Sequence, residues 1–174
     1  MQIILLLTAV FIVLFSPVRV QADQTASASI VGEIKIAQSA DDREIRMEEA
    51  LTAYRSDLTP YSKYIIDISD KHGLPWNLIA AISGVESGFC RKIPKLSYNC
   101  WGWANGKRYF NSYKDALETI ASGLKIHYFD KGLTTPELIN PIYAPPSPSW
   151  AWKVRFFMSV IENQTPDISL EFNL

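Results

Sequence analysis

The segment from Trp76 to Val85 (WNLIAAISGV) contains no charged residue, and this constrains the fold more than any other feature of the chain. A helix that is apolar on all sides has no face to present to water, so other elements must surround it. Several small residues within it would let neighbouring helices approach closely: Ala80, Ala81, Ser83 and Gly84. Pro75 stands where a proline favours a helix start, and Gly88 stands where a left-handed residue ends one. The sequence therefore predicts a buried central helix.

Patterns typical of helices occur on both sides of this segment. Further helices are predicted to begin at Asp42, Pro60, Ser112 and Ser149, with a short helical turn near Pro136–Ile139. Ser112 and Asp115 form the S-x-x-D signature of a capped helix start. No strand pattern of any length occurs, although the long aromatic-rich loop over residues 89–111 could hold a short hairpin. We therefore predict an all-α single domain of about five to six helices, with Trp150 and Trp152 packing the last helix onto the core.

The N-terminus has the composition of an export signal. Ile3–Phe15 is an apolar run of thirteen residues, and Val20-Gln21-Ala22 is a small-residue cleavage site. An uncleaved membrane anchor is the alternative, but this run falls short of the roughly 20 residues needed to span a bilayer. We predict a signal peptide over residues 1–22, a linker over 23–41, the folded domain over 42–165 and a C-terminal tail over 166–174. The mature protein is expected to be periplasmic, or secreted and associated with the cell wall.

Cys90 and Cys100 are the only cysteines, and both lie in the part predicted to be exported. An even pair in an oxidising compartment predicts a disulfide, with two free thiols as the alternative. Two cysteines and two distant histidines lack the spacing of a zinc site, so we expect neither a metal nor an organic cofactor. The formal net charge of −1 gives no general affinity for nucleic acid. We expect a monomer.

Glu86 is the first charged residue after the uncharged segment and stands at its C-terminal end. Desolvation and the negative end of the helix dipole would both raise the pKa of a carboxyl group there. A Glu that stays protonated near neutral pH is what a general acid for a glycosidic oxygen requires. Six Lys and Arg residues and no Asp or Glu lie between Ser87 and Lys114, and their positive charge would oppose this shift. A solvated or ion-paired Glu at a helix end is the alternative interpretation.

The segment Ile79–Phe89 (IAAISGVESGF) resembles the catalytic helix of the lysozyme-like superfamily, in which the Glu of an E-S-G sequence is the acid. Soluble lytic transglycosylases continue with a G-x-x-G-L-M-Q run, which is absent here. Instead, Asn99–Trp103 (NCWGW) is similar to the N-x-F-G-I segment of bacterial endo-β-N-acetylglucosaminidases of the autolysin and flagellar type. Phe110–Leu117 and Tyr143–Val154 are similar to two later landmarks of that family, F-x-S-Y-x-x-A/S and Y-A-T-D-P-x-Y-A-x-K-V. Four landmarks thus occur in the family's order.

This resemblance implies a lysozyme-like fold and, as substrate, the glycan strands of peptidoglycan, cut at β-1,4 bonds. It implies Glu86 as the catalytic acid and Tyr143 as the active-site tyrosine. It places Asn99, Trp101 and Gly102 along the substrate groove, and we predict Ser87 and Trp103 as further substrate-binding residues. The chain departs from the family at Pro145-Pro146, where the family has T-D, and at Trp101, where it has Phe.

No second carboxylate is obvious, although glycosidases usually carry two. The nearest candidates outside the loop are Asp115, Glu118 and Asp67. One carboxylate suffices if the N-acetyl group of the substrate acts as nucleophile, with Tyr143 as its hydrogen-bond partner. One also suffices in a lytic transglycosylase, where the 6-hydroxyl attacks and a 1,6-anhydro muramyl end forms. We predict the glucosaminidase reaction, with a lytic transglycosylase and a non-catalytic wall-binding module as alternatives.

Overall fold

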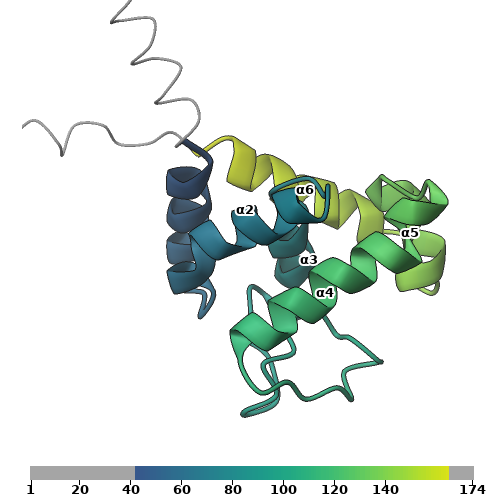
Figure 1. The fold of residues 1–174 in the computed structure, drawn as a ribbon, viewed down its shortest axis with the longest axis horizontal. Coiled ribbons are helices and arrows are strands. Elements are labelled where there is room, and N and C mark those ends of the chain that lie inside the picture. Colours follow the sequence, from purple (N-terminus) through teal and green to yellow (C-terminus); the bar gives the residue numbers. More distant parts are fainter. Residues whose placement is uncertain (1–41, 165–174) are drawn as a thin grey trace, which may run out of the picture. The chain divides into compact units, whose positions relative to one another are not determined.

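The uncharged segment forms helix α3 (Leu78–Ser87), and the prediction of a buried central helix is confirmed in the computed structural model of the protein. Eight of its ten residues are buried: Leu78, Ile79, Ala80, Ala81, Ile82, Ser83, Gly84 and Ser87. Helices α2 (Ser62–Lys71), α4 (Tyr113–His127) and α6 (Trp150–Glu162) all contact α3 (Figure 1). These neighbours shield most of the surface of α3 from water, as a helix without a polar face requires.

The structure describes residues 42–164. The predicted signal peptide, linker and C-terminal tail lie outside the described residues, as does residue 165 of the predicted domain. Within residues 42–164 the chain forms six α-helices, two short 3-10 helices and no strand, so the all-α prediction is confirmed for this range. The first helix covers residues 42–53, α5 covers Pro136–Tyr143, and the 3-10 helices are η1 (Thr59–Tyr61) and η2 (Phe129–Lys131).

The chain turns sharply away from α3 directly after Ser87. Gly88 caps the helix in the left-handed conformation with φ 61°, and Phe89 and Cys90 follow with φ 58° and 68°. This backbone costs a non-glycine residue about 1–2 kcal/mol, so neighbouring contacts must offset it. Phe89 is fully buried, and a Cβ on Gly84 would lie only 2.7 Å from its ring. Close packing of Phe89 on the small residue of α3 therefore holds the turn that ends the helix beside Glu86.

Helix α5 is longer than the sequence predicts, because it continues through Pro141 to Tyr143 instead of ending near Ile139. A proline in a helix removes one backbone donor, here the one that would reach the carbonyl of Glu137 in the first turn. The other backbone bonds of this short helix are unaffected, and the N–H of Ala144 still donates to Asn140 O at 3.0 Å. The extension matters because it carries Tyr143 on the helix and not on a flexible loop.

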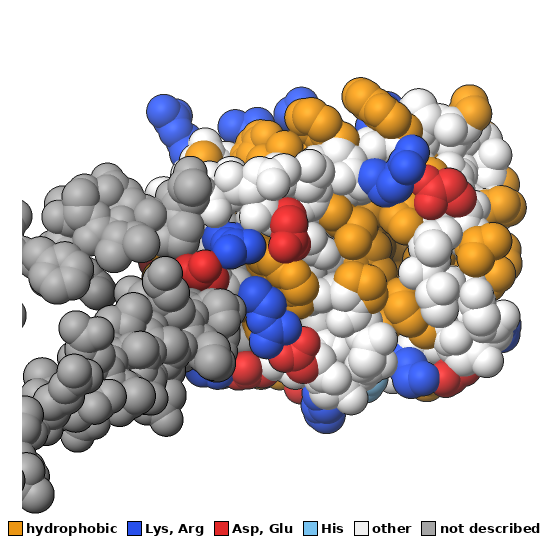
Figure 2. Space-filling view, turned by 90° about the horizontal axis from the view of Figure 1, so that it is seen from above, with side chains coloured by type: hydrophobic (Ala, Val, Ile, Leu, Met, Phe, Trp, Pro, Cys, Tyr) orange, Lys and Arg blue, Asp and Glu red, His pale blue; other side chains and the backbone are white. Residues whose placement is uncertain are grey.

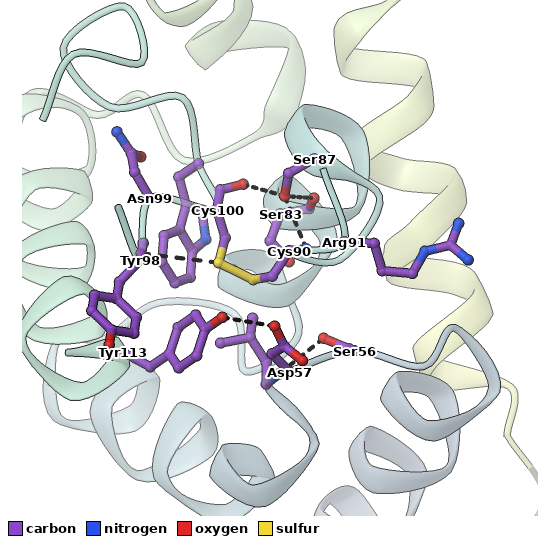
Figure 3. Close-up of a disulfide and its surroundings, with 12 residues drawn as sticks. Ser56, Asp57, Ser83, Ser87, Cys90, Arg91, Tyr98, Asn99, Cys100 and Tyr113 are labelled. Carbon is purple, nitrogen blue, oxygen red and sulfur yellow. Dashed lines mark hydrogen bonds between the residues drawn. A yellow bond between two sulfur atoms is a disulfide. The ribbon is translucent and has the colours of Figure 1, made fainter. Parts of the chain in front are cut away.

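The predicted disulfide is confirmed: Cys90 and Cys100 are bonded, with their Cα atoms 4.7 Å apart (Figure 3). It closes the first half of the long loop between α3 and α4. The predicted cap of α4 is also present, since the Ser112 hydroxyl accepts the N–H of Asp115 at 3.2 Å. Within residues 42–164, no helix combines the length and the apolar composition that crossing a membrane requires.

The two tryptophans of α6 differ in their surroundings. Trp150 is 2% exposed and packs into the core, as predicted. Trp152 is 59% exposed and stacks on the neighbouring Phe156 at 5.9 Å between ring centroids, so the prediction that it packs onto the core is wrong. Helical spacing places residues 150 and 152 on opposite sides of the helix.

Figure 2 shows hydrophobic side chains gathered at the surface of one face, with Lys, Arg, Asp and Glu around them.

Removal of the disulfide tests its share in stability. The double variant Cys90→Ser/Cys100→Ser should unfold with a free energy lower by roughly 2–3 kcal/mol, because the closed loop no longer restricts the unfolded chain. Urea denaturation followed by tryptophan fluorescence measures this difference. Reduction of the wild-type protein should reproduce the loss and should leave the double variant unchanged. Equal stability of the variant and the wild type would contradict the prediction.

Candidate active site

Glu86 lies one residue before the end of α3, where the chain leaves the buried helix. Its Oε1 accepts the indole N–H of Trp150 at 2.7 Å. Trp150 is the first residue of α6, so this bond joins the end of one helix to the start of another. The side chain nevertheless keeps an exposed surface, and the carboxyl is reachable from solvent.

The environment of Glu86 favours its neutral form. Burial raises the pKa of its carboxyl above the ordinary value of 4.5, and the hydrogen bond from Trp150 lowers it by a smaller amount. The side chain of Glu86 as a whole is exposed, but neighbouring groups shield its carboxyl oxygens from part of the solvent. The predicted direction of the shift is therefore present in the structure. The aromatic residue that contacts the carboxyl is Trp150, which the sequence predicted for the core and not for the site.

Gly102 approaches the same carboxyl from the loop. A Cβ at this position would lie 3.0 Å from Glu86 Oε2 and 3.7 Å from its Cδ. The backbone of Gly102 also has φ 62°, which favours glycine. Any side chain here would therefore meet both backbone strain and the catalytic candidate. Gly102 thus lies beside Glu86, and its contact with a substrate stays a prediction.

Tyr143 is half-buried and lies close enough to Glu86 for the charge of that carboxyl to act on its hydroxyl. Its ring stacks on Trp150 with 4.9 Å between centroids, and its hydroxyl donates to the carbonyl oxygen of Trp101 at 2.7 Å. Burial, the charge of Glu86 and the neighbouring Tyr128 hold the pKa of the Tyr143 hydroxyl well above 10. Tyr143 therefore stays protonated at neutral pH. Since its one hydrogen is bonded to Trp101, its oxygen faces any ligand only as an acceptor.

The two tryptophans predicted for the groove occupy different places. Trp101 is fully buried, and its indole N–H donates to the carbonyl of Ile79 at 2.8 Å, so its side chain belongs to the core and not to a sugar-binding surface. Trp103 is half-buried and packs on α4, where a Cβ on Gly123 would lie 2.6 Å from its ring. Trp103 keeps an exposed part, so of the two tryptophans it alone can still line a substrate groove, which stays a prediction.

The polar residues predicted for the groove hold the loop together. The Ser87 hydroxyl lies 2.8 Å from the carbonyl oxygen of Cys100, to which it donates, and accepts the N–H of Cys90 at 2.9 Å (Figure 3). The Asn99 amide donates to the carbonyls of Trp103 and Arg108 and accepts the N–H of Trp103. Both side chains are buried. Their hydrogens are used inside the protein, so direct contact of either with a substrate stays a prediction.

Asn140 is a site residue that the sequence did not indicate. Its amide nitrogen donates to the carbonyls of Ala144 and Ser147, and its Oδ1 accepts the N–H of Ala151 at 3.1 Å. One side chain thus fixes the proline-rich connection between α5 and α6, and with it the position of Trp150 beside Tyr143. An Asn in a helix before a proline gives no signal for such long-range contacts.

Positive charge gathers on the loop next to the site. Residues 88–111 carry five Lys and Arg and no Asp or Glu, which leaves −6 for the rest of a chain of net charge −1. These five are exposed, and none forms an ion pair within the described residues: Arg91, Lys92, Lys95, Lys107 and Arg108. Across residues 42–164, no group of three or more His, Cys, Asp or Glu side chains could hold a metal ion.

The fold and the site together define a helical protein with one reachable, partly desolvated carboxyl group at the end of its buried helix. Comparison of the chain with protein-family models, with curated proteins and with solved structures finds no match. Its function must therefore be inferred from the residues and geometry of this site.

The raised pKa of Glu86 predicts a pH dependence of stability. Since the pKa is higher in the folded state, the contribution of Glu86 to stability is fully present below pH 4.5 and is lost as the pH rises through the folded-state pKa. Urea denaturation between about pH 4 and about pH 8 should therefore show wild type losing stability relative to Glu86→Gln, which does not titrate. A difference between the two proteins that is constant with pH, or that grows in favour of wild type, would contradict this.

Proposed function

We propose that this protein is a lysozyme-like glycoside hydrolase that cuts β-1,4 bonds in the glycan strands of peptidoglycan, as an endo-β-N-acetylglucosaminidase. The observation that carries the proposal is Glu86: a reachable carboxyl with a raised pKa, fixed by Trp150 and faced by the backbone of Gly102. A carboxyl that is both accessible to a ligand and desolvated enough to hold its proton suits general acid catalysis.

In this reaction Glu86 donates its proton to the glycosidic oxygen while the bond from that oxygen to the anomeric carbon breaks, and the bonding electrons leave with the oxygen. The carbonyl oxygen of the substrate's N-acetyl group attacks the anomeric carbon and forms an oxazoline-type ring. Water then adds to the same carbon, Glu86 takes its proton, and the ring opens. The hydroxyl oxygen of Tyr143 can accept the N–H of the acetamido group, because its own hydrogen is bonded to Trp101.

The surroundings of the other carboxylates support a mechanism with one protein carboxylate. Asp115 Oδ2 accepts both the backbone and the side-chain N–H of Asn111. Glu118 accepts the hydroxyl of Tyr64 at 2.5 Å, and Asp67 pairs with Lys63 at 2.8 Å. All three candidates from the sequence are thus bonded elsewhere, and in the proposed reaction the substrate itself supplies the second reacting group.

The same observation favours a second candidate, a lytic transglycosylase. There Glu86 first gives its proton to the glycosidic oxygen as the bond from that oxygen to the anomeric carbon breaks. The 6-hydroxyl of the muramyl residue then attacks the anomeric carbon and gives its proton to Glu86, so no water enters. The products distinguish the two reactions: hydrolysis leaves a reducing end, and transglycosylation leaves a 1,6-anhydro muramyl end. A wall-binding module that keeps the groove without turnover is the alternative from a different class of function.

The charges around the site support an anionic glycan and not a neutral one. Peptidoglycan carries carboxylates on its peptide stems, and the five exposed basic residues of loop 88–111 offer them unpaired positive charge. A disulfide in this loop is typical of proteins in oxidising compartments. Both features suit a protein that is exported and acts on the cell wall.

Mass spectrometry of purified peptidoglycan, digested with wild type beside Glu86→Gln, tests the proposal. Wild type should release fragments with N-acetylglucosamine at the reducing end, and the variant should release at least about 100-fold less because the acid is missing. A binding assay on insoluble peptidoglycan should show that the variant still binds. Fragments with 1,6-anhydro ends would replace the hydrolase by the transglycosylase. Binding without Glu86-dependent fragments would leave only the wall-binding module.

Charge reversal in the loop tests the substrate class. Lys95→Glu/Lys107→Glu should raise KM on peptidoglycan by about tenfold at low salt, and this effect should shrink at high salt because the charges are then screened. The matched control Lys131→Glu/Lys153→Glu changes the net charge equally at exposed positions outside the loop and should have a smaller effect. Neutral oligosaccharides of N-acetylglucosamine should be cut equally by both variants. Equal effects of the two double variants on peptidoglycan would contradict the role of the loop.

A further inference from the structure

The bond between Trp150 and Glu86 has a direction that the proposed reaction can use. The indole nitrogen of tryptophan only donates, so the Glu86 oxygen that it contacts, Oε1, must accept. In a protonated carboxyl group the carbonyl oxygen accepts hydrogen bonds better than the hydroxyl oxygen does. The acid form of Glu86 is therefore most stable with Oε1 as the carbonyl oxygen and the proton on Oε2.

We propose that Trp150 is a positioning residue that assigns the catalytic proton of Glu86 to Oε2 and aims it at the space beside Gly102, where the glycosidic oxygen must then bind. Only the last part of this inference, that the glycosidic oxygen binds beside Gly102, rests on the proposed function. The hydrogen bond from Trp150 to Glu86, on which the assignment of the proton to Oε2 depends, concerns the protein alone and can be tested without any substrate.

The indole is held firmly enough to act in this way. Trp150 is 2% exposed and its ring stacks on Tyr143 at an interplanar angle of 29°. Tyr143 is itself anchored by its bond to the Trp101 carbonyl, and Asn140 fixes the backbone of Ala151. Since the donor is held before the substrate arrives, no conformational entropy is lost when it orients the acid.

The second carboxyl oxygen of Glu86, Oε2, lies beside the backbone of Gly102. Gly102 brings only backbone to Oε2, because a Cβ there would come within 3.0 Å of it. A side chain at this position would cover Oε2, so glycine leaves this oxygen less covered than any other residue would. The structure gives the two oxygens different tasks: Oε1 is bound by the protein, and Oε2 is available to the substrate.

The variant Trp150→Phe tests the inference, because it removes the N–H and keeps an aromatic ring to stack on Tyr143. The matched control is Trp152→Phe, the same change two residues away on the exposed side of α6. The first readout is ¹³C NMR titration of the Glu86 side-chain carboxyl, assigned by its loss in Glu86→Gln. Trp150→Phe should raise the pKa of Glu86, because a hydrogen bond to the charged form is lost, and Trp152→Phe should leave it unchanged.

The second readout is the pH profile on peptidoglycan. Trp150→Phe should lower kcat by about tenfold with little change in KM, and should move the basic limb of the profile to higher pH together with the NMR titration. If Trp150→Phe lowers the melting temperature while the pKa of Glu86 and the pH profile stay at wild-type values, Trp150 only packs the core and the inference is overturned.

Two further arms keep the test decisive. Should Trp150→Phe fail to fold, replacement of the indole of Trp150 by benzothiophene keeps the shape and removes only the N–H; an unshifted pKa of Glu86 in that protein overturns the inference. Failure of the proposed function looks different, since wild type then shows no turnover. The NMR titration still decides the Trp150–Glu86 contact in that case.

Discussion

The burial of α3 is the constraint on which the rest of the structure depends. A helix without charged residues over its buried length has to be enclosed, and α2, α4 and α6 all pack on it. The helix ends at Ser87, capped by Gly88, and Glu86 is the one charged residue within it. The same burial that stabilises the fold therefore brings a carboxyl group to the edge of the core, where desolvation raises its pKa while its surface stays open to solvent.

Glu86 is positioned from three separate parts of the chain. Its backbone belongs to α3, its Oε1 is bound by Trp150 at the start of α6, and its Oε2 is faced by Gly102 of the loop. Asn140 sets the connection that delivers Trp150. Convergence of distant segments on one side chain is typical of functional sites, because the precision that a reacting group needs is supplied by a rigid surrounding structure.

The residues of the loop between α3 and α4 fall into two groups. Some hold the loop together through hydrogen bonds and packing, and others are exposed to solvent. Ser87 and Asn99 use their hydrogen-bonding groups inside the loop, and the disulfide and the buried indole of Trp101 hold it against the core. Its five basic side chains are exposed and form no ion pair within the described residues, although Arg91 donates to the carbonyl of Gly88 and Arg108 lies over the ring of Phe110. A stiff loop with an unpaired positive surface beside a desolvated carboxyl suits an extended anionic ligand better than a small neutral one.

The sequence by itself determined the helical class, the buried central helix, its left-handed end at Gly88, the cap at Ser112 and the pairing of the two cysteines. These features follow from local periodicity, from backbone preferences and from residue types that few environments tolerate. Only the tertiary structure decided which aromatic residue contacts Glu86. Trp101, Trp103 and Trp150 have similar chemistry, and their roles depend on how segments separated by up to 64 positions pack together. No local pattern encodes that packing, which is why Trp150 was predicted for the core but not for the site.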